Sequence, residues 1–273
     1  MAAGAEAKLL AKRDYLAEFL GTAVLFGLGL CCFALGFSHG SPLLRAVPNS
    51  YLRSLITGTA FISINTALIY SPLGKVSGGH FNPMLTAAFY RLSKLTGPAA
   101  AAYVAAQVSG SLLGSWAAAA ALHGRVDELD LGATIPRHGQ AVWVFCIEFT
   151  ATLLLTTIIV RFVDSPRLIP FTGLAAAGLG ILVMAVEAPI SRTSLNPLRT
   201  LGPAVMSDSW SYAWLYPAAA LSGAFLAAEG YKHLRGEVAC GKLIHDNRYT
   251  CHFVNCRYTP QNLNPKSVNT TRD

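Results

Sequence analysis

Charged residues are scarce in this chain. They make up 13% of its 273 residues, whereas about a quarter of the residues in soluble globular domains are charged. Hydrophobic residues account for 53%, and the mean hydropathy is +0.43. So few charged groups cannot cover a soluble domain with a polar surface. The composition therefore favours a protein embedded in a lipid bilayer.

The patterns that enzymes use are also missing. The sequence pairs no nucleophile with a base, has no glycine-rich phosphate loop, and places no acid and base residues together for catalysis. We therefore expect a protein that is not an enzyme and that needs no cofactor.

Long apolar runs, in contrast, are abundant. About 20 apolar residues are needed for a helix to cross a bilayer, and six segments meet this need: residues 15–37, 51–71, 97–122, 141–163, 169–188 and 211–234. The first segment has no small-residue cleavage site of a signal peptide, so we expect it to be a true span. The predicted fold class is an all-α membrane protein with six transmembrane helices.

Two short stretches carry one pattern in both halves of the chain. Residues 77–84 read SGGHFNPM and residues 191–198 read SRTSLNPL. Each contains an Asn-Pro pair, suited to the N-cap and first position of a helix: Asn82 with Pro83, and Asn196 with Pro197. The apolar sequence around each pair is too short for the helix that follows to span a bilayer. Such paired, interrupted segments indicate an inverted repeat whose working site lies where the half-helix N-termini meet.

Each half also opens on a glutamate inside an apolar segment, Glu18 and Glu148. A carboxylate within the membrane is costly and is functional by default. We interpret both as acceptors for the backbone N–H groups of the re-entrant loops, which protein groups must satisfy at that depth; a proton relay is the alternative. We expect His80 to belong to the same bracing network, with a pH-sensitive gate as the alternative.

The doubled Asn-Pro motif, with Arg199 after the second copy, resembles the aquaporin family, also called major intrinsic proteins. The resemblance covers about residues 14–234. It implies six transmembrane helices plus two re-entrant half-helices in an inverted repeat, assembled as a homotetramer with one pore per subunit. It also implies a passive channel for water and small neutral solutes.

The resemblance assigns roles in that pore. Two opposed half-helix N-termini repel cations, and the amides of Asn82 and Asn196 orient passing water so that it cannot relay protons. Arg199 adds a fixed charge at the outer mouth. The family's offsets place the other constriction residues at Ile62, Met184 and Thr193. This filter is less polar than that of strict water channels, which favours small neutral solutes beside water.

Other positions separate the possible permeants. Thr200 and Ala204 stand where glycerol-conducting members carry acidic and basic residues, which favours water. Both motifs depart from the family at their third residue, where Met84 and Leu198 replace alanine. We expect these two side chains to affect the width of the pore. A glycerol facilitator, a coupled secondary transporter and a membrane sensor with a metal-binding tail are the alternative functions.

The distribution of basic residues predicts the topology. The formal net charge is +7, and most lysines and arginines flank the first segment, the first Asn-Pro motif, and the ends of the fourth and sixth segments. The positive-inside rule then places both termini in the cytoplasm, so the charge does not indicate a nucleic-acid partner. We expect a cytoplasmic segment at 1–13 and a channel domain at 14–234 with repeats at about 14–122 and 141–234, in the plasma or inner membrane.

The predicted cytoplasmic tail, residues 235–273, is polar and contains several potential metal ligands. Their types suit zinc, but their spacing matches no standard zinc pattern and includes no Cys-x-x-Cys pair. We favour reduced cysteines in an irregular tail, with a metal site as the alternative. The candidate ligands are Cys240, His245, Cys251, His252 and Cys256.

Overall fold

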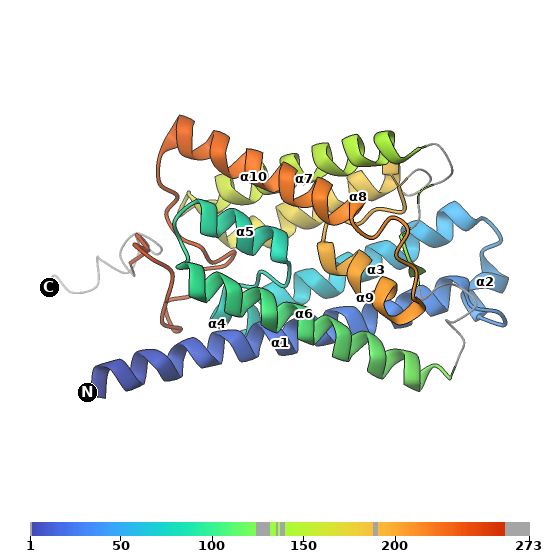
Figure 1. Cartoon of the computed structure of the whole chain (residues 1–273), viewed down its shortest axis with the longest axis horizontal. Helices are drawn as coiled ribbons and strands as arrows, with labels where there is room; N and C mark the ends of the chain where they lie inside the picture. Colours follow the sequence, from blue (N-terminus) through green and yellow to red (C-terminus); the bar gives the residue numbers. More distant parts are fainter. Residues whose placement is uncertain (1, 124–131, 135, 137–139, 188–190, 260–273) are drawn as a thin grey trace, which may run out of the picture.

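The computed structural model describes residues 2–123, 132–134, 136, 140–187 and 191–259, and all regular structure in these ranges is helical. The long helices run roughly side by side along the longest axis of the molecule (Figure 1). They are α1 (Ala2–Phe37), α3 (Ser50–Tyr70), α6 (Gly97–Ala121), α7 (Ala141–Val163), α8 (Thr172–Glu187) and α10 (Leu215–Arg235).

These helices match the six predicted spans. Four of them, taking Ile169–Phe171 (η2) together with α8, are long and apolar enough to cross a membrane. The other two, α6 and α10, contain 25 and 21 residues, which is also enough to span the hydrocarbon core. Glycines, serines and Gln107 lower the mean hydropathy of α6, and the basic last turns lower that of α10. The all-α membrane fold is confirmed.

The short helices are α2 (Pro42–Ala46), α4 (Pro72–Ser77), α5 (Pro83–Arg91) and α9 (Pro197–Ser207). At 9 and 11 residues, α5 and α9 are about 14 and 17 Å long, roughly half of a bilayer core. Each begins at an Asn-Pro pair. Asn82 and Asn196 are the N-caps, and each side-chain oxygen accepts a hydrogen bond from the backbone two residues later.

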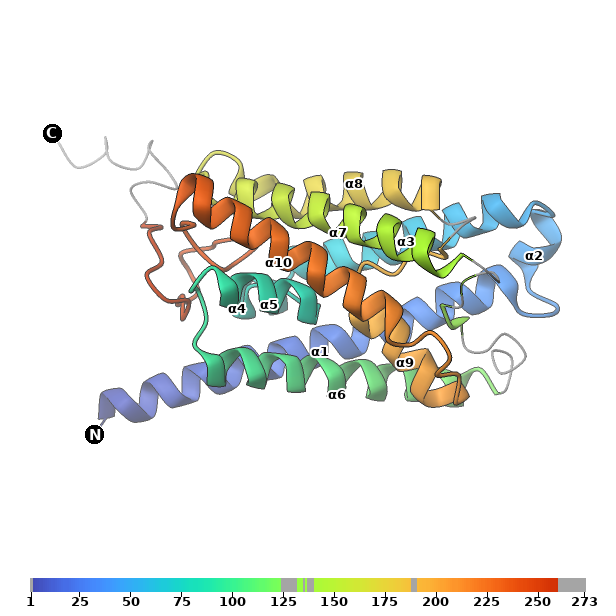
Figure 2. The same cartoon turned by 45° about the horizontal axis from the view of Figure 1, so that its top comes forward.

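The two half-helices enter from opposite ends of the bundle. In both Figure 1 and Figure 2, α5 lies toward the end that holds the chain termini, and α9 lies toward the end that holds α2. The buried core surrounds them and includes Phe81, Met84 and Leu198. The Asn-Pro pairs are thereby brought to the middle of the molecule.

Close helix contacts hold each half together, α1 against α6 and α7 against α10. A Cβ atom on Gly110 would lie 2.3 Å from the carbonyl oxygen of Phe19, and one on Gly223 would lie 2.4 Å from that of Phe149. No side chain fits in either place, so glycine is required at both crossings. Small residues at such crossings let membrane helices pack backbone against backbone.

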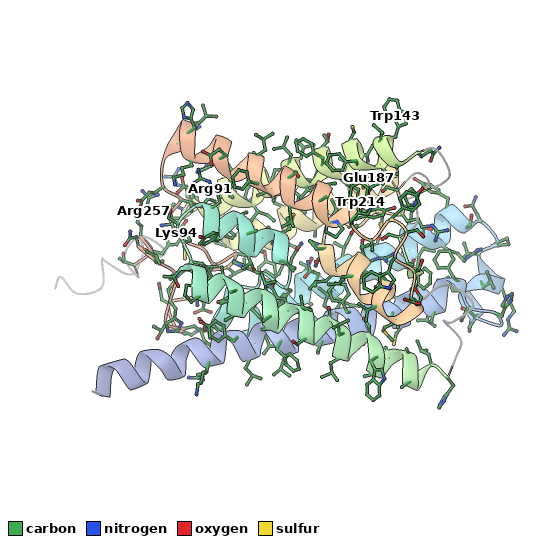
Figure 3. All side chains as sticks on the ribbon, viewed as in Figure 1. Arg91, Lys94, Trp143, Glu187, Trp214 and Arg257 are labelled. Atoms are coloured by element: carbon green, nitrogen blue, oxygen red, sulfur yellow. The ribbon has the colours of Figure 1, made fainter. Side chains whose placement is uncertain are left out.

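The segment from Gly236 to Thr259 forms no helix, yet it is packed against the end of the bundle. Val238, Cys240 and Leu243 are buried in the main core. Arg91, Lys94 and Arg257 gather at this end, whereas Trp143 and Trp214 lie at the opposite end (Figure 3). The segment therefore covers the basic end of the molecule.

Candidate functional site

Asn82 and Asn196 meet between the N-termini of α5 and α9. The side-chain amide of Asn82 donates to the carbonyl oxygen of Leu195 at 3.0 Å, and that of Asn196 donates to the carbonyl oxygen of Phe81 at 3.0 Å. Each asparagine thus caps its own half-helix and donates a hydrogen bond to the loop that precedes the other half-helix. Phe81 and Leu195 adopt positive φ angles of 45° and 52°, a strained conformation that the two reciprocal contacts help to hold.

Glu18 braces the first loop from within the bundle. One carboxylate oxygen accepts from the Ser77 hydroxyl at 2.6 Å and from the backbone N–H of His80 at 3.0 Å. The other accepts from the backbone N–H of Phe81 and from the Gln107 amide, both at 2.7 Å. The N–H groups of His80 and Phe81 are backbone donors that the strained loop does not satisfy by itself.

Glu148 repeats this arrangement in the second half. It accepts from the Ser191 hydroxyl at 3.0 Å and from the backbone N–H groups of Ser194 and Leu195 at 2.8 and 3.1 Å. Ser77 and Ser191 therefore play the same part, as do the two glutamates. Bracing of the two loops is our interpretation of both glutamates, with a proton relay as the alternative.

His80 is fully buried and contacts two parts of the chain. Its Nδ1 lies 3.1 Å from the Thr86 hydroxyl, and its Nε2 lies 2.9 Å from the carbonyl oxygen of Gly241. In the second half Ser194 contacts Thr200 at 3.1 Å, which reproduces the first contact. The bond from His80 to the C-terminal segment was not foreseen in the sequence.

A cavity of about 870 Å³ runs past the asparagine pair. Its wall includes Asn82, Asn196 and Arg199, and also the three other predicted constriction residues. Those three are Ile62, Met184 and Thr193. Ile62 is on α3, Met184 on α8, and Thr193 and Arg199 flank the second Asn-Pro pair, so the structure brings the predicted filter residues into one space.

Arg199 is half-buried at the cavity wall. Its guanidinium donates to the carbonyl oxygen of Gly132 at 2.7 Å, which fixes the position of the charge. Gly132 lies in the connection between the two halves, a long loop with no motif of its own, so the sequence offered no sign of this contact.

Met84 and Leu198 do not lie on that wall among the described residues. Both are buried in the main core beside the starts of α5 and α9. The Met84 sulfur instead contacts the Thr156 hydroxyl at 3.9 Å. The two larger side chains thus support the half-helices from behind.

Two tyrosines that also support the loops were missed in the sequence. The Tyr103 hydroxyl donates to the carbonyl oxygen of Ser77 at 2.6 Å, and the Tyr216 hydroxyl donates to that of Ser191 at 2.8 Å. Tyr103 and Tyr216 occupy corresponding helices of the two halves. Aligning the complete halves, rather than their motifs, would have shown the pair.

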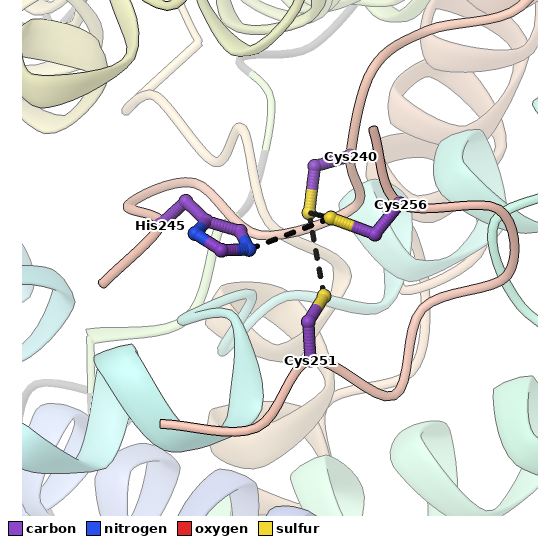
Figure 4. A group of neighbouring side chains, drawn as sticks. All are labelled: Cys240, His245, Cys251 and Cys256. Atoms are coloured by element: carbon purple, nitrogen blue, oxygen red, sulfur yellow. Dashed lines mark hydrogen bonds between the residues drawn. The ribbon is translucent and has the colours of Figure 1, made fainter. Parts of the chain in front are cut away.

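Four of the five metal-ligand candidates in the tail lie together (Figure 4). The ligand atoms of Cys240, His245, Cys251 and Cys256 are all within 4.8 Å of one another. Burial raises the pKa of the Cys240 thiol. His252 lies apart, because its Nδ1 contacts the Asp14 carboxylate at 2.7 Å.

Comparison with known proteins agrees with this architecture. Residues 6–231 match the family described as Major intrinsic protein. The chain belongs to this family. Its members are passive membrane channels for water and small neutral solutes rather than enzymes, so the predicted class of protein is confirmed.

Relatives of this major intrinsic protein come from plants, bacteria and archaea. Nodulin-26 of Glycine max is 33% identical over 171 residues, which are 62% of each chain. Glycerol uptake facilitator protein-like 6 of Lactiplantibacillus plantarum is 31% identical and is matched over 79% of this chain and 95% of its own. Aquaporin AqpM of Methanothermobacter marburgensis is 32% identical over 81% of this chain and 97% of its own.

A solved structure shows the same fold. The X-ray structure of the aquaglyceroporin from Plasmodium falciparum superposes with a TM-score of 0.66, covering 82% of this chain and 96% of that one. The two sequences are 22% identical. The two proteins therefore share the same helical fold.

Proposed function

We propose that the chain conducts water, and with it small uncharged solutes, through the cavity between α5 and α9, while it excludes ions and protons. The observation that carries the proposal is the meeting of Asn82 and Asn196 on the cavity wall, each held by the other's loop. A passive pore needs polar groups at fixed positions along an otherwise apolar wall.

The exclusion of cations follows from the half-helix N-termini. Each carries roughly half a positive charge from its unsatisfied N–H groups, and the two ends face one cavity. An asparagine amide has two N–H donors, so each can bond the opposite loop and still offer one donor to a water oxygen. Water held from both sides cannot hand a proton along a file.

Arg199 supplies the second barrier. Its bond to Gly132 holds a positive charge on the wall, where it repels cations and offers donors to a neutral solute. Ile62 and Met184 are apolar neighbours in the same cavity. Such a filter suits water and also small neutral solutes such as glycerol.

The orientation, assembly and domain limits are part of the same proposal. Both termini face the cytoplasm of a plasma or inner membrane, supported by the basic residues at the end of the bundle that holds them (Figure 3). The subunits form a homotetramer with one pore each. The channel domain covers 14–234, between a segment at 1–13 and a tail at 235–273.

The test is stopped-flow light scattering on proteoliposomes that contain the full-length protein. One run uses an impermeant osmolyte and another uses glycerol. Two variants on α8 provide the comparison. A Cβ on Gly180 would lie 3.5 Å from the Ile62 side chain, next to the cavity, whereas nothing lies within 4 Å of one on Gly178.

We expect fast osmotic shrinkage for the wild type and for Gly178→Leu, and the rate of empty liposomes for Gly180→Leu. Re-swelling in glycerol would add glycerol to the permeants. Wild-type rates equal to those of empty liposomes would contradict the channel proposal. Uptake that saturates and follows a proton gradient would favour a coupled transporter instead.

A further inference from the structure

The C-terminal segment gathers three thiols and an imidazole around one point. The sulfur of Cys240 lies 3.5 Å from that of Cys251 and 3.2 Å from that of Cys256, and the Cys256 sulfur lies 3.4 Å from Nε2 of His245. Figure 4 shows the four side chains turned toward one another from different parts of the segment. We propose that they form a binding site for zinc or a similar soft divalent metal ion.

The spacing of the ligand atoms fits a tetrahedral ion. With Zn–S bonds of about 2.3 Å, the sulfurs of a tetrahedral site lie about 3.8 Å apart, and a sulfur and a nitrogen lie slightly closer. The three contacts of 3.2 to 3.5 Å are about 0.1 to 0.6 Å shorter than these tetrahedral separations, and no pair of ligand atoms is more than 4.8 Å apart. A Cys₃His set supplies all four ligands, as structural zinc sites do, and leaves no position open for a substrate.

A disulfide explains the cluster less well. A disulfide joins two sulfurs at about 2.05 Å, and here Cys240 lies at similar distances from Cys251 and Cys256. Bonding to either partner would leave the other thiol and His245 without a function. A metal ion engages all four groups at once.

The segment that carries the site is held by loop contacts alone, such as the bond from the Arg257 backbone N–H to the carbonyl oxygen of Ala239 at 2.9 Å. Residues 236–259 form no helix or strand, and a segment without regular structure is commonly stabilised by a metal or another crosslink. The four ligands are spread from Cys240 to Cys256, so one ion would join both ends of this segment.

The site would hold the segment against the pore. Within it, the backbone N–H of Leu243 donates to the carbonyl oxygen of Gly78 at 2.9 Å, and the Lys242 ammonium donates to that of Lys75 at 2.7 Å. Leu243 also forms part of the cavity wall. The ion therefore fixes the loop that places Leu243 at this end of the cavity.

The test measures metal in full-length protein purified in detergent from cells grown with zinc. We expect about one zinc ion per chain by elemental analysis. Replacement by Co²⁺ should give the visible d–d bands of a tetrahedral site and thiolate-to-cobalt charge-transfer bands in the near ultraviolet. Cys240→Ser and Cys256→Ser should lose the ion and both sets of bands.

Two variants separate loss of ligands from loss of folding. Cys146→Ser removes an exposed thiol on α7 and should keep the full zinc content. His245→Cys keeps four ligands, so it should retain the metal with stronger charge-transfer bands, whereas His245→Ala should bind it weakly.

Three results would overturn the proposal: wild-type protein that elutes as a folded species without metal, metal that stays after Cys240 and Cys256 are both replaced, or an intact mass that reports a disulfide within the tail. Osmotic water flux is recorded on proteoliposomes made from the same preparations. A protein that conducts water but contains no zinc would contradict the proposed metal site and leave the proposed channel function unaffected.

Discussion

His80 and Gly241 are joined by a contact of 2.9 Å between the ring Nε2 and the backbone carbonyl oxygen, across 161 positions of sequence. Because a carbonyl oxygen only accepts, Nε2 carries the hydrogen of this contact. Nδ1 lies 3.1 Å from the Thr86 hydroxyl. The imidazole thus ties the loop that precedes α5 to the C-terminal segment.

We expect His80→Phe to loosen the C-terminal segment. The phenyl ring can keep the stacking on Phe89, where the ring centroids are 5.0 Å apart, but it leaves the Gly241 carbonyl without its donor, which costs about 1–3 kcal/mol. Hydrogen–deuterium exchange of peptides from 236–259 should become faster.

Ser194→Ala is the matched control for His80→Phe. It removes the equivalent contact in the second half, with Thr200 at 3.1 Å, and has no contact with the segment. Exchange that is equally fast in both variants would show that His80 has no specific part in holding the tail.

Gly223→Ala should destabilise the bundle. Its Cβ would lie 2.4 Å from the Phe149 carbonyl oxygen, so α7 and α10 would have to separate, and overpacking of this kind costs about 1–3 kcal/mol. The melting temperature in detergent, followed by tryptophan fluorescence, should fall.

Gly230→Ala on the same helix is the control. Nothing lies within 4 Å of its Cβ, so only helix propensity changes, which favours alanine by up to about 1 kcal/mol. Equal melting temperatures for both variants would mean that the crossing at Gly223 tolerates a wider separation.

Arg199→Ala should admit cations or larger neutral solutes. The change removes the positive charge that Gly132 holds on the cavity wall, and fixed charges set barriers in narrow pores. Methylammonium and glycerol uptake into proteoliposomes should both rise above the wild-type rates. Arg45→Ala removes a guanidinium that also bonds a backbone carbonyl, that of Gly40, away from the cavity, and should change neither rate.

Thr193→Cys should make water flux sensitive to mercurials and to charged methanethiosulfonate reagents. Thr193 lies on the cavity wall, so a modified thiol there would obstruct the path. The wild type, treated in the same way, shows the effect of modifying the tail cysteines. Cys146 is exposed on α7 and does not line the cavity. Full flux after complete modification of Thr193→Cys, shown by intact mass, would remove position 193 from the pore.

Some features of this protein follow from its sequence alone. Apolar length predicted the six long helices, and the N-cap preference of asparagine with proline after it predicted where α5 and α9 begin. The duplication of the sequence indicated equivalent positions in the two halves. Glu18 and Glu148 recur at the start of each half and accept hydrogen bonds from equivalent loops. These features are local or repeated, so a linear pattern carries them.

Other features were decided by tertiary structure. Met84 and Leu198 interrupt the motif in the sequence, but the rotation of each half-helix turns them into the core and away from the cavity. Arg199 finds Gly132 in a loop that has no recognisable pattern.

The tail shows the difference most clearly. Its composition contained five metal-ligand candidates of equal standing, and only the fold separates four of them from His252, which pairs with Asp14 across 238 positions. Contacts over such separations depend on how the helices pack, and no spacing within the tail encodes where α1 or the pore loop will lie. The sequence by itself determined the channel scaffold, whereas only packing decided that its end is covered by a Cys₃His cluster.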